Sequence, residues 1–444
     1  MYNNNIIDII LKLLYYFYLV LILGLLPFRQ IIRSDYLYHL SLLEIVKFII
    51  IIIFIINKLT ESKSKLEIDY SYKTRKYIIL VLISYVFSTI IGFVNQNVSE
   101  WNEVFRLSST GVDYFIFFIL IYEIIKTEKD LIIYLRIIFV LAIIATIYLP
   151  ILILMPSLLP STSEMGVLRS ETVLGFPRLF TPSETLFFLL LIGMLGYILW
   201  GGKKIKTLPT SIYFFPSILT IALIPSFIRS DYLIILFWLI ILILYKLLIK
   251  KKIIHLIQIA LIFVIILIAG SFFHDNSGQS LVNALLYRIG SVEKIGSPNE
   301  ENTVEARFME VIIANQEITS SANVVFGLGF GHRFYWPFKP DPYYATQTHN
   351  GYYSTYYSQG IIGSILFFLF LIGITKNIFM NYKLSKNSKW ENFQFSLFII
   401  WISILIANLQ APVFQNYDQI PWVVGVIALS TKANDFYNKS LVYK

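Results

Sequence analysis

The sequence predicts an all-α integral membrane protein with about twelve transmembrane helices. Hydrophobic residues make up 57% of the 444 positions and charged residues only 14%, whereas a soluble domain averages about 45–50% apolar and about 25% charged residues. The mean hydropathy is +0.70. The apolar residues also come in runs of about twenty, which is the length that crosses about 30 Å of hydrocarbon.

The expected spans follow from that length rule. They are 6–26, 40–57, 77–94, 112–125, 131–155, 185–200, 211–226, 232–249, 253–272, 351–375, 393–411 and 420–431. The first span follows no basic segment and has no small-residue cleavage site, so we expect a retained helix rather than a signal peptide. An even number of spans places both termini on one side of the membrane.

Charge in the loops predicts which side that is. One set of alternate loops holds 22 Lys and Arg residues and the other set holds 11. The richer set consists of short loops and is therefore expected to be cytoplasmic. It comprises 58–76, 126–130, 201–207, 246–252, 376–392 and the tail from 432. The net charge of +9 is explained by this topology, and we expect no nucleic-acid partner.

The two sides also differ in the kind of cation. Arg75 is the one arginine of the predicted cytoplasmic set. On the other side most cations are arginines: Arg29, Arg33, Arg106, Arg169, Arg178, Arg229, Arg288, Arg307 and Arg333. A guanidinium group binds phosphate or carboxylate through two parallel hydrogen bonds. The pattern favours an anion site, most plausibly for phosphate, and the alternative is arginine contacting lipid headgroups.

The predicted organisation has three parts. Residues 1–272 form the first nine spans, 273–350 form one long extracytoplasmic loop carrying short helices, and 351–444 form the last three spans and a cytoplasmic tail. The chain contains no cysteine, which excludes disulfides and cysteine-based sites. No acidic cluster has metal-ligand spacing on the outer side, so we expect neither a metal nor a cofactor.

Within the long loop, residues 302–318 have helical periodicity. Asn302 and Glu305 have the spacing of a capping pair at its start. An apolar face is expected from Val304, Phe308, Val311, Ile312 and Ile318. Arg307 falls on the edge of that face, so a helix at the membrane rim would direct it toward the spans. Such a placement costs desolvation free energy unless an anion meets the charge.

Two further arginines are expected close to the membrane surface. Arg178 lies in the proline-rich loop 156–184, which we interpret as irregular, a few residues before a span. Arg229 lies in a short hairpin between two spans, where a local ion pair with Asp231 is the simpler alternative. Both are candidate phosphate ligands.

The end of the long loop holds the remaining candidates. The glycines of GLGFG at 327–331, Gly329 among them, would allow a tight turn with backbone N–H groups near a bound group. His349 precedes the tenth span, and an imidazole can accept a proton from a sugar hydroxyl near neutral pH. A satisfied interfacial histidine is the alternative. The tyrosines around it fit an interfacial aromatic belt or a sugar-stacking platform.

These segments resemble the superfamily of O-antigen ligases and O-antigen polymerases. The resemblance rests on VEARFMEVI, FGLGFGH and THNGYYSTYYSQGIIGSILFFL within 303–372, and more loosely on GFPR and IRSDYL. It implies a bacterial cytoplasmic-membrane glycosyltransferase that uses a glycan on undecaprenyl diphosphate, without metal or nucleotide sugar, at the outer face of the membrane.

The resemblance also implies roles for individual residues. Arg307 and Arg178 would hold the diphosphate, Arg229 would be a weaker third ligand, and His349 would act as base or orient the acceptor. Lesser candidates are Arg288, Arg333, Gly329 and Asn350. The implied partners are the lipid-linked oligosaccharide, an acceptor glycan, the lipid bilayer and a chain-length regulator.

The sequence leaves several functions open. We expect a polymerase of O-antigen, capsule or exopolysaccharide repeat units. The first alternative is a ligase that transfers the glycan to lipid A-core of lipopolysaccharide, or to a protein hydroxyl. The second is a transporter or flippase of lipid-linked sugars, which would require a cationic path through the spans.

Overall fold

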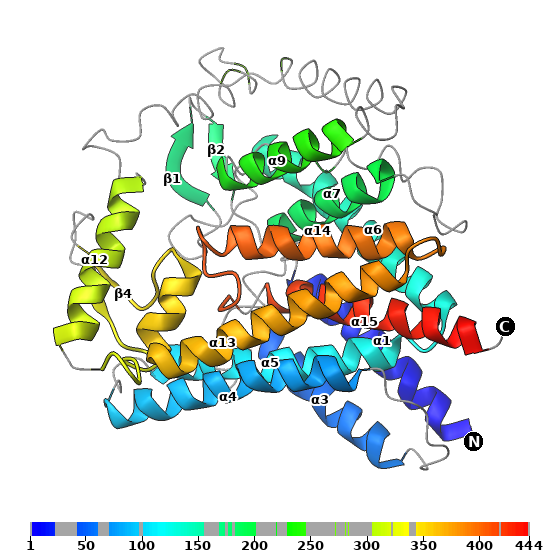
Figure 1. Ribbon diagram of the computed structural model, residues 1–444, viewed down its shortest axis with the longest axis horizontal. Helices are drawn as coiled ribbons and strands as arrows, with labels where there is room; N and C mark the ends of the chain where they lie inside the picture. Colours follow the sequence, from blue (N-terminus) through cyan, green and yellow to red (C-terminus); the bar gives the residue numbers. More distant parts are fainter. Residues whose placement is uncertain are drawn as a thin grey trace. The chain divides into compact units, whose positions relative to one another are not determined.

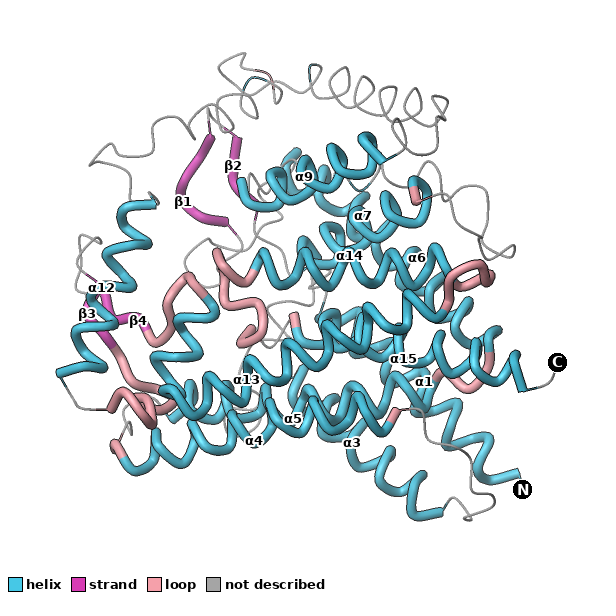
Figure 2. Tube along the Cα trace, in the orientation of Figure 1, coloured by secondary structure: helices cyan, strands magenta, loops and turns pink. Residues whose placement is uncertain are grey.

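The computed structural model of the chain describes most of the predicted membrane segments and part of the long loop (Figures 1 and 2). The residues described are 2–22, 42–60, 71–96, 101–154, 168–173, 176–179, 183–200, 229–245, 304–320, 323–336, 343–416 and 419–442, with the single positions 219, 271, 280 and 283. Every structural statement below concerns these residues.

The described chain is largely α-helical. Its helices are α1 (Tyr2–Ile22), α3 (Leu42–Thr60), α4 (Tyr72–Val94), α5 (Trp101–Ile124), α6 (Glu128–Leu154), α7 (Ser183–Leu199), α9 (Arg229–Tyr245), α12 (Val304–Ser320), α13 (Gly351–Leu384), α14 (Glu391–Ala407) and α15 (Ile420–Val442). Two antiparallel hairpins accompany them, β1 (Leu168–Val173) with β2 (Phe176–Leu179), and β3 (Phe334–Trp336) with β4 (Tyr343–Ala345).

Each predicted span that falls within the described residues coincides with one of these helices. The expected spans 211–226 and 253–272 lie outside the described residues, apart from one position in each. Among the described residues, four helices are long and apolar enough to cross a membrane: Tyr72–Val94, Leu107–Ile124, Glu128–Ile147 and Gly351–Leu384. The protein is therefore an α-helical membrane protein, as its composition predicts.

The chain divides into two compact units that do not follow the predicted three-part division. The first comprises Met1–Asp69, Leu120–Arg229 and Phe237–Arg288, and the second comprises Tyr70–Ile119, Ser230–Leu236 and Ile289–Lys444. The predicted division follows the order of the spans, whereas the units follow packing.

In the first unit, α1 packs against α3, and ion pairs join helix ends. Lys58 pairs with Glu123 at 2.8 Å, Lys12 pairs with Asp130 at 2.9 Å, and Lys126 contacts Asp8. The expectation of an irregular loop over 156–184 is wrong in part, because β1 and β2 pair within it. Main-chain hydrogen bonds between the two strands replace the irregular path that its prolines predict.

The second unit is built around α4 and α13, which run side by side in opposite directions (Figure 1). Near the end of α4, Ser88 Oγ donates to the carbonyl of Ser358 at 2.9 Å. Near its start, the ring of Tyr77 lies against Gly373, where an added Cβ would meet it. Helices α14 and α15 pack on α13.

Helix α13 is interrupted at Gly360, whose φ of 61° and ψ of −163° are not helical. The expected span over 351–375 therefore lies in α13, but the helix is broken at Gly360. A short segment ends at Gln359, and the following segment, 361–384, is about 36 Å long at 1.5 Å per residue, which exceeds the hydrocarbon thickness of about 30 Å. The break leaves backbone groups without helical partners.

Those partners come from residues 324–331, which contain the glycine cluster and are called the glycine loop below. The N–H groups of Leu328 and Gly329 donate to the carbonyls of Tyr357 and Ser358 at 3.0 and 2.9 Å. The amides of Ile361 and Ile362 donate to the carbonyls of residues 324 and 325 at 3.0 and 3.2 Å. The expectation that these glycines present N–H groups to a bound group is thus not met at Leu328 and Gly329. The cluster completes a broken helix, which is the condition under which non-helical backbone is tolerated at membrane depth.

The loop between α14 and α15, which includes Phe414, also packs inside the second unit. The carbonyl of Phe414 accepts hydrogen bonds from Tyr85 and Tyr114 at 2.8 and 3.1 Å. The ring of Phe414 makes edge contacts with Phe367 and Trp401 at centroid distances of 5.5 and 5.8 Å. This loop therefore forms part of the aromatic core of the second unit.

Candidate functional site

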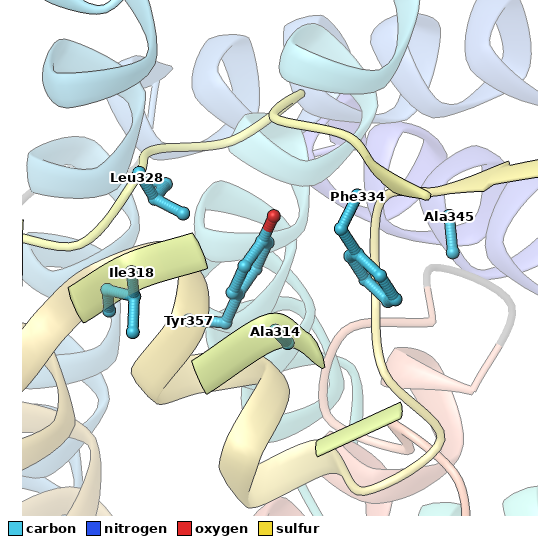
Figure 3. Packing of buried hydrophobic residues seen from close by; sticks show 6 residues of the cluster. All are labelled: Ala314, Ile318, Leu328, Phe334, Ala345 and Tyr357. Carbon is cyan, nitrogen blue, oxygen red and sulfur yellow. The ribbon is translucent and has the colours of Figure 1, made fainter. Parts of the chain in front are cut away.

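Within the second unit, a small apolar core packs helix α12 against its neighbours. Ala314 and Ile318 of α12 are fully buried with Leu328, Phe334, Ala345 and Tyr357, as Figure 3 shows. The cluster joins α12 to the β3–β4 hairpin and to the first segment of α13. These elements form the frame of the candidate site.

The buried face of α12 agrees with the predicted one at Ile318 and differs from it at Phe308 and Glu310. Phe308, expected on the apolar face, is 67% exposed, whereas Glu310 is 2% exposed. Ala314 and Ile318 follow Glu310 at helical spacing on the buried face. The periodicity rule assigns an acidic residue to the polar face, so it could not have found Glu310.

Glu310 is buried against His349. The backbone N–H of His349 donates to Oε2 of Glu310 at 2.9 Å, and Nδ1 of the ring lies 3.1 and 3.2 Å from the two carboxylate oxygens. The His349 side chain is 43% exposed. One carboxylate therefore fixes both the main chain and the ring of this histidine, while the ring remains accessible.

Arg307 lies one turn before Glu310 on α12 and is partly buried. Residues three apart on a helix share a face. The side chain of Arg307 therefore extends from the same side of α12 as the side chain of Glu310. Arg307 is neither buried nor fully exposed, and its predicted direction toward the spans stays a prediction. The helix that carries Arg307 is thus also the helix that holds the His349 ring, through Glu310.

A second histidine pair lies two turns further along the helix and was missed by the sequence reasoning. His332 Nε2 lies 3.0 Å from Oε1 of Glu317, and both side chains are partly exposed, at 26% and 35%. The His332 ring contacts Tyr357 edge-on at a centroid distance of 5.9 Å. The sequence did contain one signal for this pair. Glu310 and Glu317 are seven residues apart, which is two helical turns, so the two glutamates share one side of α12.

The lesser candidates have structural positions. Asn350 caps α13, because its Oδ1 accepts the N–H groups of Tyr352 and Tyr353 at 3.1 and 3.0 Å. Gly329, with a φ of 79°, lies against the backbone of Gly92. Arg333 is exposed immediately before β3.

The other predicted arginines are less closely defined. Arg178 lies on strand β2 and Arg229 is the first residue of α9, and the side chains of both are outside the described residues. Arg288 and Asn302 lie outside the described residues altogether. The arginines expected to act with Arg307 therefore have no described geometry.

Among the described residues, no group of three or more His, Cys, Asp or Glu side chains could hold a metal ion. Comparison with protein-family models finds none that matches this chain, and no curated protein matches it. The class that the fold defines is an α-helical membrane protein, and its function is argued from the site.

Proposed function

We propose that this protein is a membrane glycosyltransferase that polymerises oligosaccharide repeat units carried on undecaprenyl diphosphate. The observation that carries the proposal is the pairing of His349 with the buried Glu310, one helical turn from Arg307. A general base and a guanidinium group on neighbouring elements suit attack by a hydroxyl on a carbon that bears a diphosphate leaving group.

In the proposed reaction, His349 takes the proton of the acceptor hydroxyl. The acceptor oxygen forms a bond to the anomeric carbon of the donor glycan, and the bond from that carbon to the diphosphate breaks. Negative charge then develops on the leaving lipid diphosphate, and a fixed guanidinium stabilises charge that appears in the transition state. Arg307 is proposed for this role, and the parts of Arg178 and Arg229 as diphosphate ligands stay predictions from the sequence.

The proposed topology has about twelve spans, both termini in the cytoplasm of a bacterium, and the site at the outer face of the cytoplasmic membrane. It is supported by loop charge, since Lys-rich short loops stay inside. The product would be O-antigen, capsule or exopolysaccharide.

A transporter of lipid-linked sugar is the rival class. Transporters built on broken helices direct the free ends of those helices at the substrate. In this chain the amides of Ile361 and Ile362 and the carbonyls of Tyr357 and Ser358 bond the glycine loop instead. Because these backbone groups at the break in α13 are already hydrogen-bonded within the protein, the break favours the transferase over the transporter.

The test is the length distribution of glycan on the cell surface and on the lipid carrier in strains carrying Arg307→Ala or His349→Ala. A polymerase predicts single units on the surface and no ladder. Long chains that remain on the carrier would instead identify a ligase that acts on lipid A-core or a protein. Lys386→Ala, which removes an exposed cation from the predicted cytoplasmic loop 376–392, is the control and should give a normal ladder. Normal profiles for both site variants would overturn the proposal.

A further inference from the structure

We propose that Glu310 is the positioning residue for His349, fixing the ring so that Nδ1 carries the proton and Nε2 is free to accept one from the acceptor hydroxyl. The inference rests on the proposed function and adds the group that sets the state of the base. It concerns one side chain whose burial and contacts are fully within the described residues.

The burial of Glu310 is the first step. Its side chain is 2% exposed, and a buried carboxylate is destabilising unless hydrogen bonds and a partner charge offset the lost hydration. Its described contacts are with His349: the backbone N–H at 2.9 Å and Nδ1 at 3.1 and 3.2 Å. A residue selected only for packing at this position would be apolar, like Ala314 one turn later.

The chemistry of the contact gives the tautomer. An ionised carboxylate is an acceptor only, so the ring nitrogen facing it is the one that carries hydrogen. In a neutral imidazole the other nitrogen is then an acceptor. Because the His349 side chain is 43% exposed, the Nε2 atom is the ring nitrogen left for substrate.

The same contact persists after proton transfer. When Nε2 takes the acceptor proton, Nδ1 still carries its hydrogen and still donates to the carboxylate, so the ring keeps its orientation. Glu310 therefore orients the base before and during the reaction. It does not need to touch the substrate.

The second pair provides the comparison within the same molecule. Glu317 is 35% exposed and contacts His332 through Nε2, not Nδ1, and the ring packs on Tyr357. This pair joins the loop to α12 two turns from Glu310 and lacks the buried carboxylate. Glu317→Gln is thus a matched control for the loss of a histidine–carboxylate contact on this helix.

The experiment uses the full-length protein in lipid nanodiscs, with single repeat units on their lipid carrier, purified from the host strain, as donor and acceptor. The rate of joining two units is measured with long incubations, so that residual rates are quantified. Glu310→Gln should lower kcat about 10²-fold or more, within the range of a general base, with little change in the KM for the donor. Glu310→Asp should recover part of the rate, and Glu317→Gln should retain it.

The decisive variant combines Glu310→Gln with His349→Ala. If Glu310 acts through His349, the double variant is no slower than His349→Ala alone, because coupled residues are not additive. A further loss in the double variant, or an equal loss in Glu317→Gln, would show a structural role and overturn the inference while leaving the proposed function in place. If His349→Ala retains the wild-type rate, the inference fails, and if Arg307→Ala also retains it, the proposed function fails.

Discussion

The backbone N–H of Gly329 donates a 2.9 Å hydrogen bond to the carbonyl of Ser358, immediately before the break in α13. Gly329 has a φ of 79°, and a Cβ at this position would overlap the backbone of Gly92. The contact therefore brings together a loop, a broken helix and α4. It explains the glycine cluster by packing rather than by binding of a substrate.

The first prediction follows from this contact. Gly329→Ala should destabilise the protein by about 1–3 kcal/mol, the cost of a strained backbone position, and the overlap with Gly92 adds to it. The measurement is the apparent Tm in detergent, together with the amount of folded protein in the membrane. Val325→Ala, at a 45% exposed position of the same loop, should leave both values close to wild type. An unchanged Tm for Gly329→Ala would contradict the described packing.

The second prediction separates capping from chemistry at Asn350. Asn350→Ala should cost about 1 kcal/mol of stability, since its side chain accepts two N–H groups at the start of α13. Asn350→Asp retains the acceptor oxygen and should retain both stability and the glycan ladder. A stable Asn350→Asp protein without a ladder would show that the amide takes part in the reaction. Thermal unfolding and the glycan profile are measured on the same variants.

The third prediction concerns the kind of cation at 307. Arg307→Lys keeps the charge but removes the planar pair of donors that fits a phosphate. We expect a raised KM for the lipid-linked donor and a lower kcat, because the charge on the leaving diphosphate is less well stabilised. The measurement is the nanodisc rate over a range of donor concentrations, and Arg136→Lys, at an exposed arginine of α6, is the control. Wild-type kinetics in Arg307→Lys would rule out two-point recognition by this residue.

The fourth prediction concerns the shared acceptor in the aromatic core. Tyr85→Phe or Tyr114→Phe removes one donor and should cost about 0.5–1.5 kcal/mol. Because each variant leaves the Phe414 carbonyl one donor, the double variant should cost more than the sum, as a buried carbonyl then loses both partners. Apparent Tm values of the three proteins test this. Simple additivity would indicate that the two bonds are independent.

The fifth prediction addresses sidedness. The chain has no cysteine, so single cysteines can be introduced without background. A membrane-impermeant maleimide added to intact cells with a permeable outer envelope should label Tyr335→Cys, which is exposed beside the site. It should label Lys386→Cys, also exposed, only after the membrane is opened. The reverse pattern would place the proposed site in the cytoplasm.

The sequence by itself determined the class of the protein and the positions of its helices. Length and hydropathy of apolar runs are local properties, so the expected spans within the described residues coincide with helices. The candidate residues Arg307 and His349 were also predicted from local features, helical spacing for one and the end of the loop for the other.

Only the tertiary structure decided how distant parts of the chain meet. Glu310 and His349 are 39 positions apart, and nothing in the period of α12 indicates that a glutamate rather than Phe308 is buried. The break at Gly360 likewise depends on its neighbours, because the glycine loop supplies the hydrogen bonds that a continuous helix would have made for itself. Burial of a polar group is favourable only when its partner is in place, and the partner is determined by packing across the chain.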